Sequence, residues 1–182
     1  MSKVERKRRS EGGFNLIEVI VAMALMAVVV VSIMGLFVAG RRNVYSGKQM
    51  TQAVAVANRV METMSGLDKP GVVAAFGLPA TGTGASVSVN GVTYANSFLR
   101  TTSNITAAND VSGYLTTWRN DIVNNKRFSN PEVSVIITPA GDSTNTPAHI
   151  DTGTLLRIRT VVTWREGTRR RNVTLDSVKV FR

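Results

Sequence analysis

The first long feature of the chain is an apolar run near its N-terminus. From Val19 to Ala39, only Ser32 and Gly35 interrupt the apolar residues. A helix of about 21 residues is roughly 31 Å long, close to the bilayer hydrocarbon thickness of about 30 Å. Residues 21–31 include no polar side chain, so a helix here would have no face for water, which disfavours a soluble core helix. The run predicts a membrane-spanning helix.

Beyond Gly40 the apolar residues continue at helical spacing, at steps of three and four, with polar residues between them. This stripe consists of Met50, Val54, Ala57, Met61, Met64 and Leu67. Gly66, followed by Pro70-Gly71, predicts where the helix ends. We therefore expect one helix of about 50 residues, half in the membrane and half amphipathic. Its second half needs a covering layer.

The C-terminal segment 155–180 alternates apolar and polar residues and predicts a hairpin turning at residues 166–168. One face of this hairpin carries Leu156, Ile158, Thr160, Val162, Trp164, Val173 and Leu175. Val178 and Val180 fall in the opposite parity, which predicts a bulge or a bend near residues 176–177.

Two further segments have strand character. Residues 132–138 form a β-branched run, and residues 86–94 read as a small hairpin turning at Asn90-Gly91. Residues 114–125 suit a helix or a strand equally. Taken with the long helix, these segments predict an α+β fold in which a small antiparallel sheet covers the amphipathic half of the helix.

Composition supports one folded domain with an appendage. The chain has 182 residues, of which 43% are hydrophobic and 19% charged. It has no cysteine, and its single histidine, His149, cannot build a histidine-based metal cluster. Part of the net charge of +10 precedes the apolar run. By the positive-inside bias, we expect a cytoplasmic N-terminus and translocation of the chain that follows the span.

No segment has the pattern of a catalytic or cofactor site. The glycine-rich residues 81–86 lack the strand, helix and lysine of a phosphate loop. The aspartates of the polar segments, Asp110, Asp121, Asp142 and Asp151, do not have calcium-loop spacing, although a calcium ion in a loop stays open. We expect no enzyme activity, no cofactor and no dedicated metal site.

One acid, Glu18, stands at the start of the apolar run, where a carboxylate is costly unless it is paired. A cleaved signal peptide would place its cut after the run, and Val38-Ala39-Gly40 is small enough for that. The run is longer than a usual signal-peptide core, and the small pair Gly12-Gly13 precedes it. This order favours a cut on the cytoplasmic side that leaves the helix attached.

Residues 12–26, "GGFNLIEVIVAMALM", closely resemble the class III signal of type IV pilins and type II secretion pseudopilins. The family pattern is a short basic leader, a glycine, an aromatic residue and then, usually, Thr-Leu-Ile-Glu. Here these positions are Gly13, Phe14 and Glu18, with Asn15 where threonine is usual. The resemblance implies cleavage by prepilin peptidase between Gly13 and Phe14, and methylation of the new Phe14 amine. It also implies that Glu18 pairs with the Phe14 amine of a neighbouring subunit during assembly.

The resemblance further implies three parts: a cleaved leader (1–13), a transmembrane and assembly helix (14–40) and a periplasmic globular domain (41–182). The expected architecture is the pilin fold, with the long helix on an antiparallel sheet. The expected partners are major and minor pilins, prepilin peptidase, an inner-membrane assembly platform and, before assembly, membrane lipid. The subunit would start as a single-pass inner-membrane protein and end in a cell-surface pilus.

The C-terminal hairpin looks most like minor pilins of the PilV kind. A minor pseudopilin of a type II secretion system is the alternative. Basic residues crowd this hairpin, with Arg169, Arg170 and Arg171 at its turn. Such a cluster suits phosphate contacts and makes DNA a further candidate partner, as in a DNA-uptake tip subunit. The competing interpretation is a solvated edge whose charges discourage strand aggregation.

Overall fold

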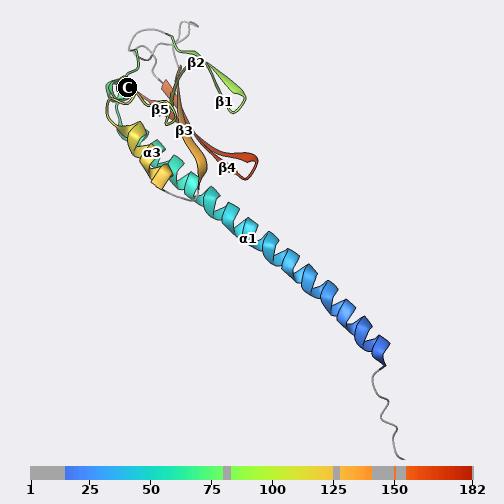
Figure 1. Cartoon of the computed structure of the whole chain (residues 1–182). Helices are drawn as coiled ribbons and strands as arrows, with labels where there is room; N and C mark the ends of the chain where they lie inside the picture. The colour runs from blue at the N-terminus through green and yellow to red at the C-terminus, as the bar shows by residue number, and fades with distance from the viewer. Residues whose placement is uncertain (1–14, 80–82, 125–127, 141–149, 151–154, 182) are drawn as a thin grey trace, which may run out of the picture. The chain divides into compact units, whose positions relative to one another are not determined.

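One long helix, α1 (Leu16–Gly66, 51 residues), opens the structure and confirms the prediction of a single continuous helix (Figure 1). This computed structural model describes residues 15–79, 83–124, 128–140, 150 and 155–181. The chain divides into two compact units, Met1–Tyr45 and Ser46–Arg182. The helix contributes its first part to one unit and its last part to the other.

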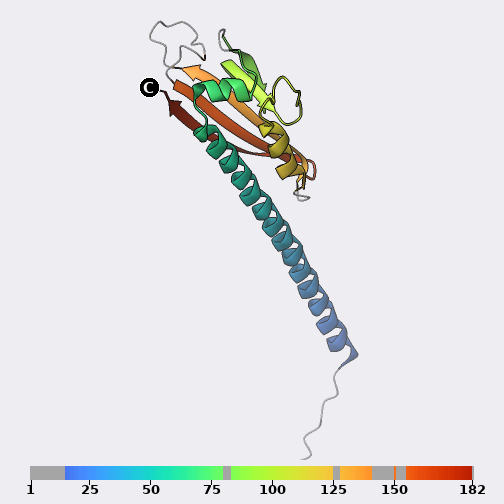
Figure 2. The ribbon, with the colours of Figure 1, turned by 90° about the vertical axis from the view of Figure 1, so that its left-hand side faces the viewer.

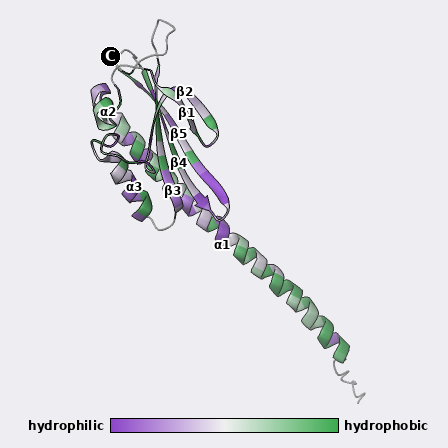
Figure 3. Cartoon of the chain, turned by 45° about the horizontal axis from the view of Figure 1, so that its top comes forward, coloured by the Kyte–Doolittle hydropathy of each residue, from purple (hydrophilic) through white to green (hydrophobic). Residues whose placement is uncertain are grey.

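In the first unit, every described residue from 15 to 45 is exposed. The apolar stretch is an almost uninterrupted green in Figure 3, and its most apolar 18-residue window has a mean hydropathy of 2.9. By length and composition, this helix can span a membrane. The structure thus supports the predicted span in its coarse form.

The second unit is built on a sheet of five antiparallel strands in the order β1-β2-β3-β4-β5. The strands are β1 (Ala85–Val89), β2 (Val92–Thr101), β3 (Ser129–Ala140), β4 (Leu155–Glu166) and β5 (Arg169–Val180). Two short helices, α2 (Lys69–Ala75) and α3 (Tyr114–Asn124), precede β1 and β3 respectively. The α+β layout expected from the sequence is therefore present, with the last part of α1 and α3 on one face of the sheet (Figures 1 and 2).

The buried face of α1 differs from the predicted stripe. Its buried residues are Gln49, Ala53, Ala57, Val60 and Met64. Met50 is 49% exposed, while Val54, Met61 and Leu67 only flank the core. Ala57 and Met64 of the predicted stripe are thus confirmed as buried, whereas Gln49, Ala53 and Val60 were not predicted. The small side chains of Ala53 and Ala57 let the helix approach the sheet closely.

The two predicted hairpin turns are confirmed. Val89 pairs with Val92 across Asn90 and Gly91, whose φ angles of 51° and 80° are those of a tight type I′ turn. Glu166 pairs with Arg169 across a turn that contains Gly167 with φ 60°. Glycine meets this left-handed requirement without strain.

The predicted face of the β4–β5 hairpin is also confirmed: Leu156, Ile158, Thr160, Val162, Trp164 and Val173 are buried, and Leu175 packs against the core. The predicted bulge near residues 176–177 is wrong, because β4 and β5 pair without a register shift from Leu155–Val180 to Glu166–Arg169. Val178 and Val180 simply lie on the face away from the helix, 60% and 63% exposed. A bulge would have turned these valines toward the helix, but in the regular strand Lys179 occupies the position that faces the helix.

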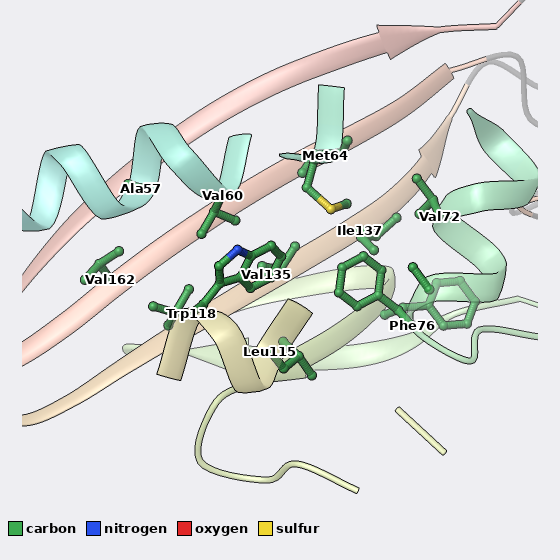
Figure 4. Packing of buried hydrophobic residues seen from close by; sticks show 14 of the residues in the cluster. Ala57, Val60, Met64, Val72, Phe76, Leu115, Trp118, Val135, Ile137 and Val162 are labelled. Atoms are coloured by element: carbon green, nitrogen blue, oxygen red, sulfur yellow. The ribbon is translucent and has the colours of Figure 1, made fainter. Parts of the chain in front are cut away.

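The ambiguous segment 114–125 is helical in its described part, as α3, and α2 was not predicted. A helix start at α2 was readable in the sequence, because Asp68 caps it with a 2.8 Å hydrogen bond from the Gly71 amide and Pro70 lies in its first turn. Both helices contribute buried side chains to the hydrophobic core. Trp118 of α3 is 2% exposed and lies close to the sheet (Figure 4). Its ring forms a triangle with those of Phe76, after α2, and Tyr114, with centroid distances of 5.9 Å and 6.1 Å from Trp118 and 6.2 Å between the other two.

Two basic side chains in this unit donate hydrogen bonds to backbone carbonyl groups at the ends of helices. Lys179 Nζ donates to the carbonyl oxygens of Ser65 (2.7 Å), Met64 and Leu67 at the end of α1. Arg100 donates to the carbonyl oxygens of Phe76 (2.8 Å) and Gly77 (3.2 Å), just after α2, and burial lowers its pKa. Helix ends leave carbonyl groups unsatisfied and carry negative partial charge, so both contacts stabilise the fold.

Candidate functional site

The first candidate site is the start of α1. The backbone carbonyl of Asn15 accepts hydrogen bonds from the amides of Glu18 (2.8 Å) and Val19 (3.3 Å), so the helix is fully wound by the position of the acid. Glu18 lies in the first turn, where the helix dipole favours a negative charge. The carboxylate is exposed within its own unit and has no ion-pair partner among the described residues. A neighbouring molecule can therefore reach it.

Glu18 also stands at one end of a shallow apolar groove on the helix. The groove is lined by Glu18, Val19, Ala22, Met23, Met26, Ala27, Val30 and Val31. These positions repeat at intervals of three and four, so they form one face over three to four turns. Ala22 and Ala27 lower the surface between the longer methionine side chains, which suits close approach of another helix.

The polar interruption in the span is satisfied within the helix. Ser32 Oγ donates to the carbonyl oxygen of Val28 at 2.8 Å. A hydroxyl group bonded in this way needs no partner from the hydrocarbon phase. Gly35 and Gly40, farther along, have no atom within 4 Å of an added Cβ. Apart from Ser32, whose hydroxyl group is already bonded, the side chains of residues 19–39 thus offer only apolar contact.

The structure covers only part of the predicted processing site. Gly13 and Phe14 lie outside the described residues. The predictions for the scissile bond and for the methylated amine therefore stay predictions, as does the pairing of Glu18 with a Phe14 amine.

The second candidate site is the basic hairpin, where the three predicted arginines have different environments. Arg170 lies 3.4 Å from Glu132 on β3, and Arg171 lies 2.9 Å from Glu166 on β4. Arg169 is exposed at the turn and has no ion-pair partner in the described structure. Two of the three charges are thus partly neutralised by acids, which leaves a weaker phosphate-binding cluster than the sequence alone indicated.

Sequence reasoning missed an ion pair on the sheet face away from the helix. Arg159 binds Asp176 through two hydrogen bonds of 2.6 Å and also lies over the Tyr94 ring, 4.7 Å from its centroid. The hydrogen bond from Arg159 lowers the pKa of Asp176 and raises that of Arg159. The two residues are direct cross-strand partners. Their opposite charges, placed symmetrically about the hairpin turn, were the available signal.

The aspartates considered for calcium have other roles where they are described. Asp110 accepts hydrogen bonds from the amides of Leu115 (2.8 Å) and Thr116 (2.9 Å) at the start of α3, and Asp121 pairs with Arg59 at 2.8 Å. Asp142 and Asp151 lie outside the described residues. Within the part of the chain that is described, no three His, Cys, Asp or Glu residues cluster as a metal site.

The candidate sites are therefore an exposed apolar helix with Glu18 at its start and a basic edge of the sheet. Comparison of the chain with protein-family models, curated proteins and solved structures finds no match.

Proposed function

We propose that this protein is a minor pilin, a structural subunit of a type IV pilus or of its tip complex. One observation carries the proposal. A pilin-like processing motif, Gly13-Phe14 with Glu18 five residues after the glycine, leads directly into a single helix that is apolar and exposed at first and builds a domain core later. A filament subunit needs this combination, because its first half must leave lipid and pack on other helices.

The role of Glu18 follows from electrostatics in an apolar setting. The valine, alanine and methionine contacts of the groove are similar at several axial offsets, so they select a register weakly. An acid that pairs with one cation, the Phe14 amine of a neighbouring subunit, selects a single register. Such pairing contributes specificity more than stability, because both charges lose hydration.

Processing is the first test. Mass spectrometry of the mature protein is expected to find a methylated Phe14 as its first residue. An N-terminus at Met1, or one beyond Ala39, would contradict the proposal, because the helix would then keep its leader or be lost with a signal peptide.

Assembly is the second test. Glu18→Ala is expected to leave membrane insertion and cleavage nearly intact and to reduce incorporation into sheared pili, measured by fractionation at equal expression. Glu62→Ala, which removes an exposed acid elsewhere on α1, is the matched control and should incorporate normally. Equal incorporation of Glu18→Ala and wild type would show that Glu18 is only a boundary residue. An equal drop in cleavage would place its role at the peptidase.

The same motif and helix suit a minor pseudopilin of a type II secretion system. Co-fractionation with sheared surface pili supports the pilus subunit. Retention with a secretion complex, together with loss of protein export on deletion, supports the pseudopilin.

A further inference from the structure

The two edges of the sheet differ in how they are protected. β1, at one edge, has 5 residues and a register shift between Ala85 and Val87. β5, at the other edge, has 12 residues, pairs with β4 without a shift and includes no proline. Native edge strands avoid pairing with other chains by shortness, bulges, proline or outward charges. β1 has two of these protections, and the backbone of β5 has none.

Charges do not protect the second half of β5 either. Lys179 would ordinarily guard an edge, but its ammonium group is directed to the carbonyl oxygens at the end of α1. Asp176 is held by Arg159. What remains outward on the face away from the helix is Val178 and Val180, which are 60% and 63% exposed. β5 is thus a long, regular and partly apolar edge with no second neighbouring strand in the described structure.

The charge around this edge indicates what it can pair with. β4 and β5 together contain seven basic and two acidic residues, a net charge of +5. Both acids are already engaged, Glu166 by Arg171 and Asp176 by Arg159. Arg157, the cross-strand partner of Val178, lies 3.6 Å from Asp176 and still keeps 54% of its side chain exposed. A positive potential therefore surrounds the apolar positions of the edge.

We propose that β5 is a docking edge for an extended, acidic segment of a partner protein, which adds to the sheet as a sixth strand. Backbone hydrogen bonds along β5 would hold the segment, as in other cases of strand addition. Alternate apolar side chains of the segment would contact Val178 and Val180, and its acidic side chains would face Arg157 and the arginines at the turn. This surface belongs to the second unit, and the inference does not depend on the pilin assignment.

A second copy of this chain is a poor occupant. The chain carries a net charge of +10, so two copies of the basic edge repel each other. The acids in its described strands are Glu132, Glu166 and Asp176, and each is already within 4 Å of an arginine. No described strand of this chain thus offers a free acidic segment, and the proposed occupant is a segment of another protein.

The experiment measures hydrogen–deuterium exchange of the full-length protein in detergent micelles, with a short blocked peptide that alternates valine or threonine with glutamate. At saturating peptide, we expect exchange of the β5 amides to slow about tenfold, with no change in β1. Added salt should weaken the binding, because exposed charges contribute to it. The same peptide with lysine in place of glutamate should not protect β5.

Two variants locate the contact. Val178→Glu removes an apolar contact and places an acid beside the acidic peptide, so it should weaken peptide binding about tenfold. Val92→Glu, at a valine that is 51% exposed next to the other hairpin turn, is the matched control and should bind as wild type does. The proposal is overturned by absent protection, by equal binding of the lysine peptide, by protection of β1 or by unchanged binding of Val178→Glu. Protection of residues 169–171 by duplex DNA, without any by the peptide, would overturn it in favour of nucleic acid.

Discussion

Replacing Lys179 with methionine isolates the contribution of one ammonium group to the second unit. Methionine keeps an unbranched side chain of similar length but cannot donate to the carbonyl oxygens of Met64, Ser65 and Leu67. A hydrogen bond involving a charged group contributes about 1.5–3 kcal/mol net, and a cation at a helix C-terminus contributes about 0.3–1 kcal/mol. Because Lys179 is half-buried, we expect a loss near the lower end, about 2 kcal/mol.

The two tryptophans make this loss measurable in the intact protein. Trp118 and Trp164 are the only tryptophans in the chain, both lie in the second unit, and both are nearly buried. Urea unfolding in detergent, followed by tryptophan fluorescence, therefore reports on that unit alone. With a slope of about 2 kcal/mol per molar urea, the midpoint should fall by about 1 M.

Lys48→Met, at an exposed lysine of the same helix, serves as the control and should shift the midpoint little. If Lys179→Met unfolds at the same urea concentration as Lys48→Met, Lys179 does not stabilise the end of α1, and the reasoning is wrong.

Two further substitutions test backbone strain and the surface ion pair. In Gly77→Ala, the new Cβ would lie 1.8 Å from the Ala108 carbonyl oxygen at a φ of 53°, so we expect a loss of at least about 2 kcal/mol in urea unfolding. Gly91→Ala, at φ 80° but in open space, should lose only about 1 kcal/mol, and equal losses would rule out the steric contact. Asp176→Asn removes a carboxylate whose pKa in the folded protein is lowered from its ordinary 3.8, first by the hydrogen bond from Arg159. The stability that the carboxylate contributes is therefore present at neutral pH and is lost as the pH falls through the lowered pKa. Because the pair is partly exposed, the free energies of unfolding of wild type and Asp176→Asn should differ by only about 0.2–1 kcal/mol at pH 7. The difference should disappear as the pH falls through the lowered pKa, and a difference that stays constant in acid would contradict the role of the charge.

Local sequence patterns correctly predicted the elements in which each face has a single environment, either buried or exposed. The apolar run and its continuation predicted α1, and strict alternation predicted the buried face of β4, since both periods are direct consequences of backbone geometry. Asn90-Gly91 predicted its hairpin turn because few other residue pairs accept two left-handed φ angles.

The errors arose where tertiary contacts override the local pattern. Val178 and Val180 looked like core residues, but the position between them is needed for Lys179, whose partners lie more than a hundred residues earlier. Likewise, the predicted stripe of α1 rightly included Ala57 and Met64 but also included Met50, which is 49% exposed, whereas close packing on the sheet buries Ala53. For the candidate site, the sequence singled out Glu18, which lies exposed in the first turn of α1, while its pairing stays a prediction. The sequence gave no sign that Glu132 accompanies Arg170, because the position of β3 beside the hairpin is not local, whereas the pair of Glu166 and Arg171 lies within the predicted hairpin.

The hydrogen bonds from Lys179 to the end of α1 have a mechanical consequence. In the second unit, the last part of α1 lies along the strands, and its end is fastened to β5 (Figure 2). A pull on this part of the helix, directed toward residue 46, is therefore transmitted along the strands rather than across them. The twelve cross-strand pairs of β4 and β5 then share the load in shear instead of opening one after another. Tension on the helix should leave this unit folded until many contacts fail together.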